Sequence, residues 1–278
     1  MASSQPELPP LREVIARHNL SARHALGQHY LLDSNITDRM VRTAGNLTGN
    51  HVIEIGPGPG GLTRSLLKQG TRHVTAIERD SRCIPALKEL QQVYPDRLTV
   101  IEGDALKIDP VALCAKPRKI IANLPYNIAT PLIIGWLRNA GEWDSLTLML
   151  QKEVAERIAG KPNMKSYGRL SVIVQWLCAV KLEFNVNKQA FVPPPKVMSS
   201  VISLTPHNKP EWPVTAISWT ALETVTQAAF GQRRKMIRSS LKPLGINLEA
   251  LGIDPKIRAE NLSIKDFCRL AEAYVESN

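Results

Sequence analysis

Four consecutive residues, Asn123-Leu124-Pro125-Tyr126, combine groups that could hold a flat ligand carrying an amino group. The side-chain carbonyl of Asn123 and the backbone carbonyl of Leu124 can each accept a hydrogen bond from that group. Pro125 restrains the preceding backbone to an extended conformation and so directs the Leu124 carbonyl, while Tyr126 offers a flat face for stacking. A simple turn at the end of a strand is the structural alternative, because asparagine and proline are common in turns.

A glycine-rich segment, EIGPGPGGLT at 54–63, follows a predicted strand and opens a predicted helix. Gly56 and Gly58, with two further glycines after them, let the backbone approach a ligand closely, and the helix N-terminus beyond carries a partial positive charge. The spacing satisfies both the dinucleotide-binding fingerprint and the loop of S-adenosylmethionine-dependent methyltransferases. Taken alone, it leaves both cofactors and a tight turn open.

Two acidic residues follow the next two predicted strands. Glu78 lies 22 positions after Gly56, where a carboxylate can accept both ribose hydroxyls of an adenosine. Asp104, in the segment EGDAL, would lie near the exocyclic amine of the adenine. A dinucleotide enzyme has less need of this second acceptor, so Asp104 favours S-adenosylmethionine. The structural alternatives are a solvated loop acid for Glu78 and a helix N-cap for Asp104.

In this order along a sheet, the 123–126 segment suits methyl transfer to the N6 amine of adenine. The lone pair of that nitrogen is delocalised into the ring, and acceptors at Asn123 and Leu124 would draw the nitrogen towards tetrahedral geometry. Tyr126 would stack on the extruded base, and positioning of the methyl donor would supply most of the rate. No strong general base is required, since methylation makes the N6 proton acidic and water can remove it.

Predicted strands and helices alternate from residue 51 to residue 160, which indicates a mostly parallel sheet covered on both faces. Thr130 is the expected N-cap of one helix, with Pro131 at its first position. The segment 168–177 could be a buried helix or strand. The expected strands are 51–55, 73–78, 98–104, 119–124, 145–151, 180–186 and 197–206, the last two paired, and the expected helices are 11–20, 35–45, 61–70, 81–94, 130–140 and 152–160.

A linker with three prolines at 205–213 separates this region from one with only helical periodicity. We therefore predict a catalytic α/β domain at 1–206, with a helical segment at 11–45, and a small all-α domain at 207–278. Two short helices are expected within 248–274. A helix is expected over GQRRKMIRSSLKP at 231–243, and its cations are candidate RNA contacts unless they form an ordinary solvated face: Arg233, Arg234, Lys235, Arg238 and Lys242.

The overall composition agrees with a polyanionic partner. The chain has 278 residues, and 35 Lys and Arg against 25 Asp and Glu give a formal net charge of +10. The four cysteines are far apart and lack metal-ligand spacing, which argues against a metal site or a disulfide framework and favours a reducing cytoplasm. No apolar segment is long enough to predict a membrane span or a secretory signal.

Seven ordered motifs resemble those of the ribosomal RNA adenine dimethyltransferases, most closely the bacterial small-subunit branch. The resemblance covers about residues 11–270 and implies a Rossmann-like S-adenosylmethionine-dependent methyltransferase. It implies dimethylation at N6 of two adjacent adenosines near the 3′ end of 16S rRNA, on an assembly intermediate of the small ribosomal subunit. The motifs are GQHYLLD (27–33), EIGPGPGGLT (54–63), IERD (77–80), EGDAL (102–106), NLPYN (123–127), FVPPPKVMSSV (191–201) and AFGQRRKMIRSSL (229–241).

The resemblance also implies roles for individual residues. Phe191 would close on the face of the target base opposite Tyr126, with a core anchor as the alternative reading. His29 and Tyr30 stand where the family usually has Asn and Phe. His29 can still donate a hydrogen bond to a carboxylate, and it predicts pH-sensitive cofactor binding unless it acts only as a neutral substitute for Asn. The implied cofactor contacts are His29, Leu31, Gly56, Gly58, Glu78, Asp104, Ala105 and Asn123.

Other functions remain as alternatives at this point. One is a large-subunit rRNA adenine methyltransferase of the macrolide-resistance type, and another is a non-catalytic ribosome assembly or transcription factor on the same scaffold. A dinucleotide oxidoreductase is disfavoured, since no catalytic Tyr-Lys or His pairing is evident. We expect a cytoplasmic monomer.

Overall fold

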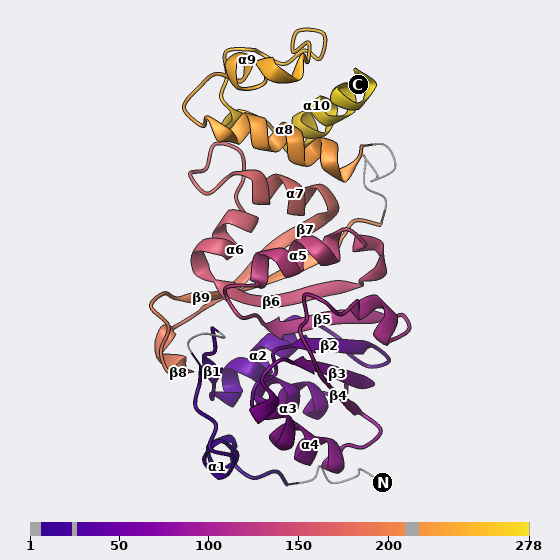
Figure 1. Ribbon diagram of the computed structural model, residues 1–278, viewed down its shortest axis with the longest axis vertical. Helices are drawn as coiled ribbons and strands as arrows, with labels where there is room; N and C mark the ends of the chain where they lie inside the picture. Colours follow the sequence, from indigo (N-terminus) through magenta and orange to yellow (C-terminus); the bar gives the residue numbers. More distant parts are fainter. Residues whose placement is uncertain (1–6, 24–26, 209–216, 278) are drawn as a thin grey trace. The chain divides into compact units, whose positions relative to one another are not determined.

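The computed structural model describes residues 7–23, 27–208 and 217–277, which form two compact units (Figure 1). The first unit comprises Met1–Lys152 and Lys181–Thr205, and the second Glu153–Val180 and Pro206–Asn278. The last passage of the chain from the first unit to the second follows Thr205, near the boundary expected at residue 207. Glu153–Val180, however, groups with the C-terminal unit, although the prediction placed these residues in the catalytic domain. Part of the expected linker, and the start of the N-terminal tail, fall outside the described residues.

A seven-stranded sheet organises the first unit, with strand order β4-β3-β2-β5-β6-β9-β7. Five strands run parallel, and β9 pairs antiparallel with β6. The predicted mostly parallel sheet is therefore confirmed, and the last two predicted strands lie side by side. The bounds are β2 His51–Ile55, β3 His73–Glu78, β4 Leu98–Glu102, β5 Arg118–Asn123, β6 Ser145–Gln151, β7 Cys178–Val186 and β9 Ser199–Pro206.

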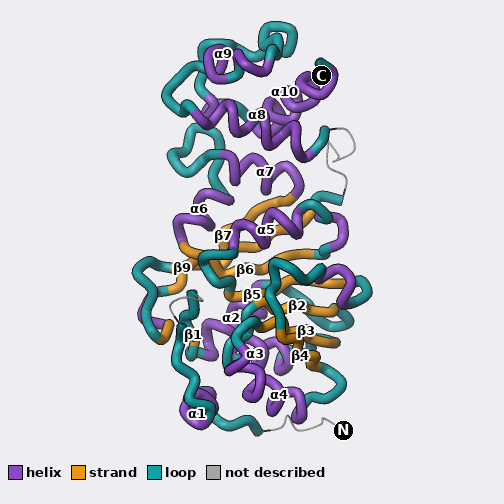
Figure 2. Tube along the Cα trace, in the orientation of Figure 1, coloured by secondary structure: helices purple, strands orange, loops and turns teal. Residues whose placement is uncertain are grey.

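Apolar side chains on both faces of the central strands are buried. Val52 and Ile53 are neighbours on β2 and therefore point to opposite faces, yet both are fully buried, as are Ile120 and Ile121 on β5. This pattern is typical of a parallel sheet with both faces covered. Helices lie along the sheet (Figure 2), and those of this unit are α1 Leu11–Arg17, α2 Ser34–Thr43, α3 Gly61–Lys68, α4 Ile84–Val93 and α5 Ala129–Leu137.

The start of α5 differs from the prediction. Its N-cap is Ile128 rather than Thr130, so Pro131 occupies the third helical position. The chain already turns at Pro125, whose carbonyl accepts the Ile128 N–H at 3.2 Å, and this turn starts the helix earlier. Proline fits there because the N–H groups of the first turn have no helical partner.

A short antiparallel pair, β1 (Tyr30–Leu31) with β8 (Phe191–Val192), joins two motifs far apart in sequence. Tyr30 lies opposite Val192 and Leu31 opposite Phe191. The pair brings the 27–33 segment beside the proline-rich segment that precedes β9.

The second unit is helical in its described residues, apart from the start of β7. The ambiguous segment 168–177 is a helix, and α7 packs against α8 and α10. Phe230 stacks on Phe267 with ring centroids 5.3 Å apart, and Phe267 is fully buried. The helices are α6 Lys152–Ile158, α7 Arg169–Leu177, α8 Trp219–Gly231, α9 Ile237–Ser240 and α10 Ile264–Glu276.

The helix predicted at 231–243 is wrong. α8 ends at Gly231, and α9 is a separate single turn. Between them Met236 is extended and forms a β-bridge with Arg258, and the Ile237 N–H donates to the Ile257 carbonyl at 2.8 Å. This tertiary pairing competes with helix continuation, so the cations do not form one helical stripe. Of the two helices expected within 248–274, only α10 forms a full helix.

No helix in the described ranges has the length and apolarity that crossing a bilayer requires.

A substitution at Gly61, the first residue of α3, can test how tightly the first unit is packed. A Cβ built there would lie 2.9 Å from the Leu31 carbonyl oxygen, which belongs to the backbone and cannot easily move. We expect Gly61→Ala to lower the free energy of unfolding by about 1–3 kcal/mol in urea titrations. Gly135→Ala in α5 is the control, since no atom lies within 4 Å of its Cβ position. It should be neutral or stabilising, and equal effects of both changes would contradict the packing argument.

Candidate active site

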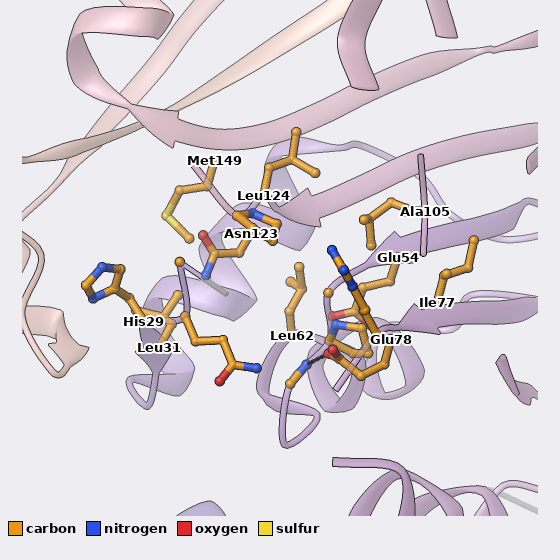
Figure 3. Close-up of a pocket in the computed structure, with 18 of the residues that line it drawn as sticks. His29, Leu31, Glu54, Leu62, Ile77, Glu78, Ala105, Asn123, Leu124 and Met149 are labelled. Atoms are coloured by element: carbon orange, nitrogen blue, oxygen red, sulfur yellow. Dashed lines mark hydrogen bonds between the residues drawn. The ribbon is translucent and has the colours of Figure 1, made fainter. Parts of the chain in front are cut away.

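A pocket lies at the carboxyl ends of β2, β3 and β5 (Figure 3). The chain runs outward from β2 to β3 and β4, then crosses to β5 on the other side of β2. Such a switch point leaves a crevice beyond the strand ends, which is where α/β sheets bind ligands. The glycine loop follows β2 on one side of this crevice, and the 123–126 segment follows β5 on the other. Figure 3 shows Asn123 between His29 and Glu78.

The backbone of the glycine loop has a conformation that would be strained for any residue other than glycine. Gly56, Gly58 and Gly60 have φ values of 67°, 55° and 90°. A Cβ at Gly58 would lie 3.2 Å from the ring of Tyr30, so the 27–31 segment packs directly on the loop. The glycine loop therefore forms one wall of a pocket together with the 27–31 segment, and is not an isolated tight turn.

Glu78 is held by backbone donors. Its side chain accepts the Gly58 N–H at 2.8 Å and the Asp80 N–H at 2.7 Å, one on each carboxylate oxygen. Burial raises the pKa of Glu78, and these backbone hydrogen bonds oppose that shift. A carboxylate can accept about four hydrogen bonds, so both oxygens keep capacity for ribose hydroxyls. The solvated-acid alternative does not fit a residue that is 5% exposed.

Asp104 and Ala105 line the pocket beyond β4. Asp104 accepts the Leu106 N–H at 3.1 Å and lies 3.5 Å from a guanidinium nitrogen of Arg79. The residues after Asp104 form a turn and not a helix, so Asp104 is not a helix N-cap. Its position at the pocket agrees with the predicted adenine contact.

Glu54 is a pocket residue that sequence reasoning missed. It precedes the glycine loop on β2, is 1% exposed, and its Oε2 atom has no hydrogen-bond partner among the described residues. Burial raises the pKa of Glu54 to about 8, and the nearby charge of Glu78 acts in the same direction. The available signal was an acid inside the otherwise apolar strand HVIEI. A buried carboxyl with one oxygen unpartnered at a pocket suits a polar or cationic ligand group.

The 123–126 segment lies on the opposite side of the pocket. Leu124 is 1% exposed and donates its N–H to the Met149 carbonyl at 3.2 Å, which fixes the backbone beside Asn123. The Tyr126 hydroxyl is 2.7 Å from Ser199 Oγ. Burial raises the pKa of Tyr126. All four residues line the pocket, as predicted.

His29 joins this side of the pocket to the proline-rich segment. Its ring lies 5.8 Å from that of Tyr126, at 30° between planes. Its Nδ1 is 2.8 Å from the Pro193 carbonyl, and because a carbonyl only accepts, Nδ1 is the donor. The predicted pH-sensitive binding at His29 stays a prediction.

Gln28 is a second residue that sequence reasoning left unassigned. Its amide donates to Asp80 at 2.9 Å and accepts the Tyr30 hydroxyl at 3.3 Å. Hydrogen bonds with Arg82 hold the pKa of Asp80 down at about 2. Gln28 therefore ties the 27–31 segment to the residue whose N–H orients Glu78. Its signal was its place inside the GQHYLLD motif.

Phe191 does not reach the pocket. Its side chain is 1% exposed and belongs to the core cluster that also contains Leu31, Met149 and Val201. In this structure Phe191 therefore does not form the predicted wall for a target base, and it fits the alternative role of a core anchor. Residues on an antiparallel pair alternate between faces, and Phe191 takes the inward one.

The five predicted RNA contacts are all exposed in the second unit. Arg233 is fixed by an ion pair with Glu260 at 3.0 Å and a hydrogen bond to the Lys165 carbonyl at 2.8 Å. Arg238 and Lys242 follow the break at Met236, so they do not share one continuous helix with Arg234 as the predicted helix at 231–243 required. Within the described ranges no group of His, Cys, Asp and Glu could hold a metal ion.

Comparison with known proteins identifies the family. The family model described as "Ribosomal RNA adenine dimethylase" matches residues 19–276. Proteins named "Ribosomal RNA small subunit methyltransferase A" are similar: that of Rhodospirillum rubrum is 56% identical, over 96% of this chain and 92% of its own. That of Paramagnetospirillum magneticum is 55% identical over 96% and 95%.

Solved structures agree. A dimethyladenosine transferase from Plasmodium falciparum has a TM-score of 0.78 and 28% identity, over 89% of this chain and 98% of its own. The 23S rRNA methyltransferase ErmE has a TM-score of 0.68 and 25% identity, over 88% and 99%. The fold and site thus define an S-adenosylmethionine-dependent methyltransferase with a Rossmann-like sheet. The chain belongs to the ribosomal RNA adenine dimethylase family, as the motifs predicted.

The pocket residues fit S-adenosylmethionine, the cofactor of this family. The positive-φ glycines allow close backbone approach, Glu78 and Asp104 supply acceptors at the ends of successive strands, and Glu54 Oε2 is an unpartnered acceptor. The individual contacts predicted at His29, Leu31 and the other implied residues stay predictions, although every one of them lines this pocket.

The raised pKa of Glu54 predicts a pH effect on stability. Because the pKa is about 8 in the folded chain against an ordinary 4.5, the folded state holds an extra proton between these values. Stability should therefore fall as pH rises from 5 to 8.5. A pKa that differs by one between the folded and unfolded chain changes stability by roughly 1 kcal/mol, so Glu54→Gln should flatten the pH dependence of the unfolding free energy by at least that amount. Parallel curves for both proteins in urea titrations would contradict the assignment.

Proposed function

We propose that this chain transfers methyl groups from S-adenosylmethionine to N6 of two adjacent adenosines in the 3′-terminal hairpin of 16S rRNA, dimethylating each. The observation that carries this proposal is Asn123 at the end of β5, across the crevice from the glycine loop and Glu78. The names of the relatives at 55–56% identity support the small-subunit RNA, whereas the structure of the large-subunit enzyme ErmE is 25% identical to this chain.

The chain's own residues would act by binding and orienting the amine. The Asn123 side-chain oxygen and the Leu124 carbonyl accept the two hydrogens of the unmethylated N6 amine, and this draws the nitrogen towards tetrahedral geometry and localises its lone pair for attack. Tyr126, with its hydroxyl bonded to Ser199, supplies the stacking face. S-adenosylmethionine supplies a methyl group on a positively charged sulfur. Fixed placement of the amine beside the glycine loop then accounts for most of the rate.

The proposed partner is 16S rRNA within the small subunit or its assembly intermediate, bound by a monomer in the cytoplasm. The net charge of +10 supports a polyanionic partner. In the second unit, the proposed phosphate contacts are the exposed cations Arg234, Lys235, Arg238 and Lys242, with Arg233 held by Glu260.

Asn123→Ala tests the proposed chemistry. We expect it to abolish transfer of labelled methyl groups to unmethylated small subunits, while cofactor affinity measured by calorimetry stays largely intact. Mapping of the wild-type product should place the label on the 3′-terminal hairpin adenosines. A label elsewhere in the RNA would contradict the proposal, and so would full activity of the Asn123→Ala variant.

Arg234→Gln combined with Lys235→Gln tests the RNA contacts. Each lost phosphate contact reduces the slope of log affinity against log salt by about one. The slope measured by filter binding to small subunits should therefore fall by about two in the double variant. Arg12→Gln with Lys88→Gln, a matched pair of exposed cations in the first unit, should leave the slope unchanged. Equal slopes for both variants would contradict the assignment.

A further inference from the structure

The proline loop, residues 192–198 (VPPPKVM), is an exposed apolar surface that has no role in the reaction proposed above. Val192 is 52% exposed, Val197 44% and Met198 39%. Only Pro195 in this loop is buried. Large apolar side chains seldom gather on an exposed loop unless they contact a partner.

The loop is fixed to the stacking face of the active site. At one end the Pro193 carbonyl accepts a hydrogen bond from His29, whose ring packs beside Tyr126. At the other end Ser199 bonds the Tyr126 hydroxyl, and the Met198 carbonyl accepts the Lys152 N–H at 2.8 Å. Three prolines limit the backbone further. A surface held this way needs little ordering when it binds, which lowers the entropic cost of association.

The charge around the loop favours nucleic acid. Residues 184–208 contain two lysines, Lys188 and Lys196, and no aspartate or glutamate, although the whole chain has 25 acidic residues. Both lysines are exposed. An apolar loop with one lysine of its own, a second lysine shortly before it and no anion suits nucleobases flanked by phosphates better than a basic protein surface.

The reaction creates an apolar surface in the RNA that needs a partner. An adenosine must leave its stack to enter a pocket, which costs a few kcal/mol and uncovers one face of its neighbour. Proteins that unstack bases often place apolar side chains, methionine and proline among them, against the uncovered step. In the proposed substrate the neighbour is itself an adenosine awaiting methylation.

We propose that the proline loop packs against the uncovered base of the adenosine next to the one in the pocket, with Val197 and Met198 as the contacting side chains. The contact would offset the lost stacking and keep the second adenosine beside Tyr126 for the next transfer. This inference rests on the proposed function, and its tests separate the two.

Crosslinking tests the contact directly. The variant Val197→p-benzoylphenylalanine is irradiated with unmethylated small subunits and S-adenosylhomocysteine, and the RNA is mapped by reverse transcription. The expected stop lies at or next to the target adenosines. The control Val93→p-benzoylphenylalanine places the same group at another exposed valine, on α4, and should give no such stop. A crosslink from position 197 to a ribosomal protein, to a second copy of the chain or to RNA elsewhere would overturn the inference.

Kinetics test what the contact does. Val197→Ser with Met198→Ser removes apolar surface that the contact would bury, so it should lower kcat/KM for small subunits roughly tenfold with cofactor affinity unchanged. Val93→Ser with Leu182→Ser removes two other exposed apolar side chains and should match wild type. If wild type labels the hairpin adenosines but the loop variant equals wild type, only this inference fails. If wild type labels none of them, the proposed function fails and the inference falls with it.

Discussion

The backbone amide of Gly58 is the point on which the pocket depends. The Gly58 N–H donates a hydrogen bond to Glu78. Gly58 has a positive φ, which residues with a Cβ rarely adopt, and a Cβ there would also crowd the ring of Tyr30. One residue therefore joins the glycine loop, the end of β3 and the 27–31 segment. Gln28 closes the same ring of contacts through Asp80, whose own N–H holds the other oxygen of Glu78. The acceptor for a ribose is thus oriented before a ligand arrives, so little binding energy is lost in ordering it.

Two buried carboxyls give this pocket its electrostatic character. Glu54 and Glu78 are both almost fully buried, and each has a raised pKa because burial disfavours its charged form. A ligand that carries positive charge relieves that penalty, whereas a dinucleotide with its pyrophosphate would increase it. The cationic sulfur and amine of S-adenosylmethionine match this environment. The glycine spacing alone could not separate the two cofactors, and a second buried acid, Glu54, beside Glu78 favours the cationic one.

The sequence predicted the sheet well, and the residues implied as cofactor contacts gather at one pocket, because both features depend on local patterns. Alternating apolar strands and glycine positions specify a parallel sheet and its switch point, and acids at strand ends then fall in place. The prediction was wrong at 231–243, where the bridge between Met236 and Arg258 interrupts the helix. That pairing joins residues 22 apart in sequence, and no local propensity reports it. Glu54 was missed for a related reason: an acid within an apolar strand gives no sign of facing a pocket until the neighbouring strands are placed.

Phe191 and Val192 show why the target side of the site was harder to predict. The two residues are neighbours on β8, and a strand sends neighbouring side chains to opposite faces. The motif fixes that an aromatic and an aliphatic residue precede the prolines, but it leaves open which of them faces the core. Pairing with β1 does not decide the matter, because Leu31 opposite Phe191 and Tyr30 opposite Val192 are both buried. Packing decides it: Phe191 lies in the core cluster with Met149 and Val201, and Val192 is exposed. A motif that was expected to supply one wall of a pocket instead supplies a rigid support and an exposed apolar surface.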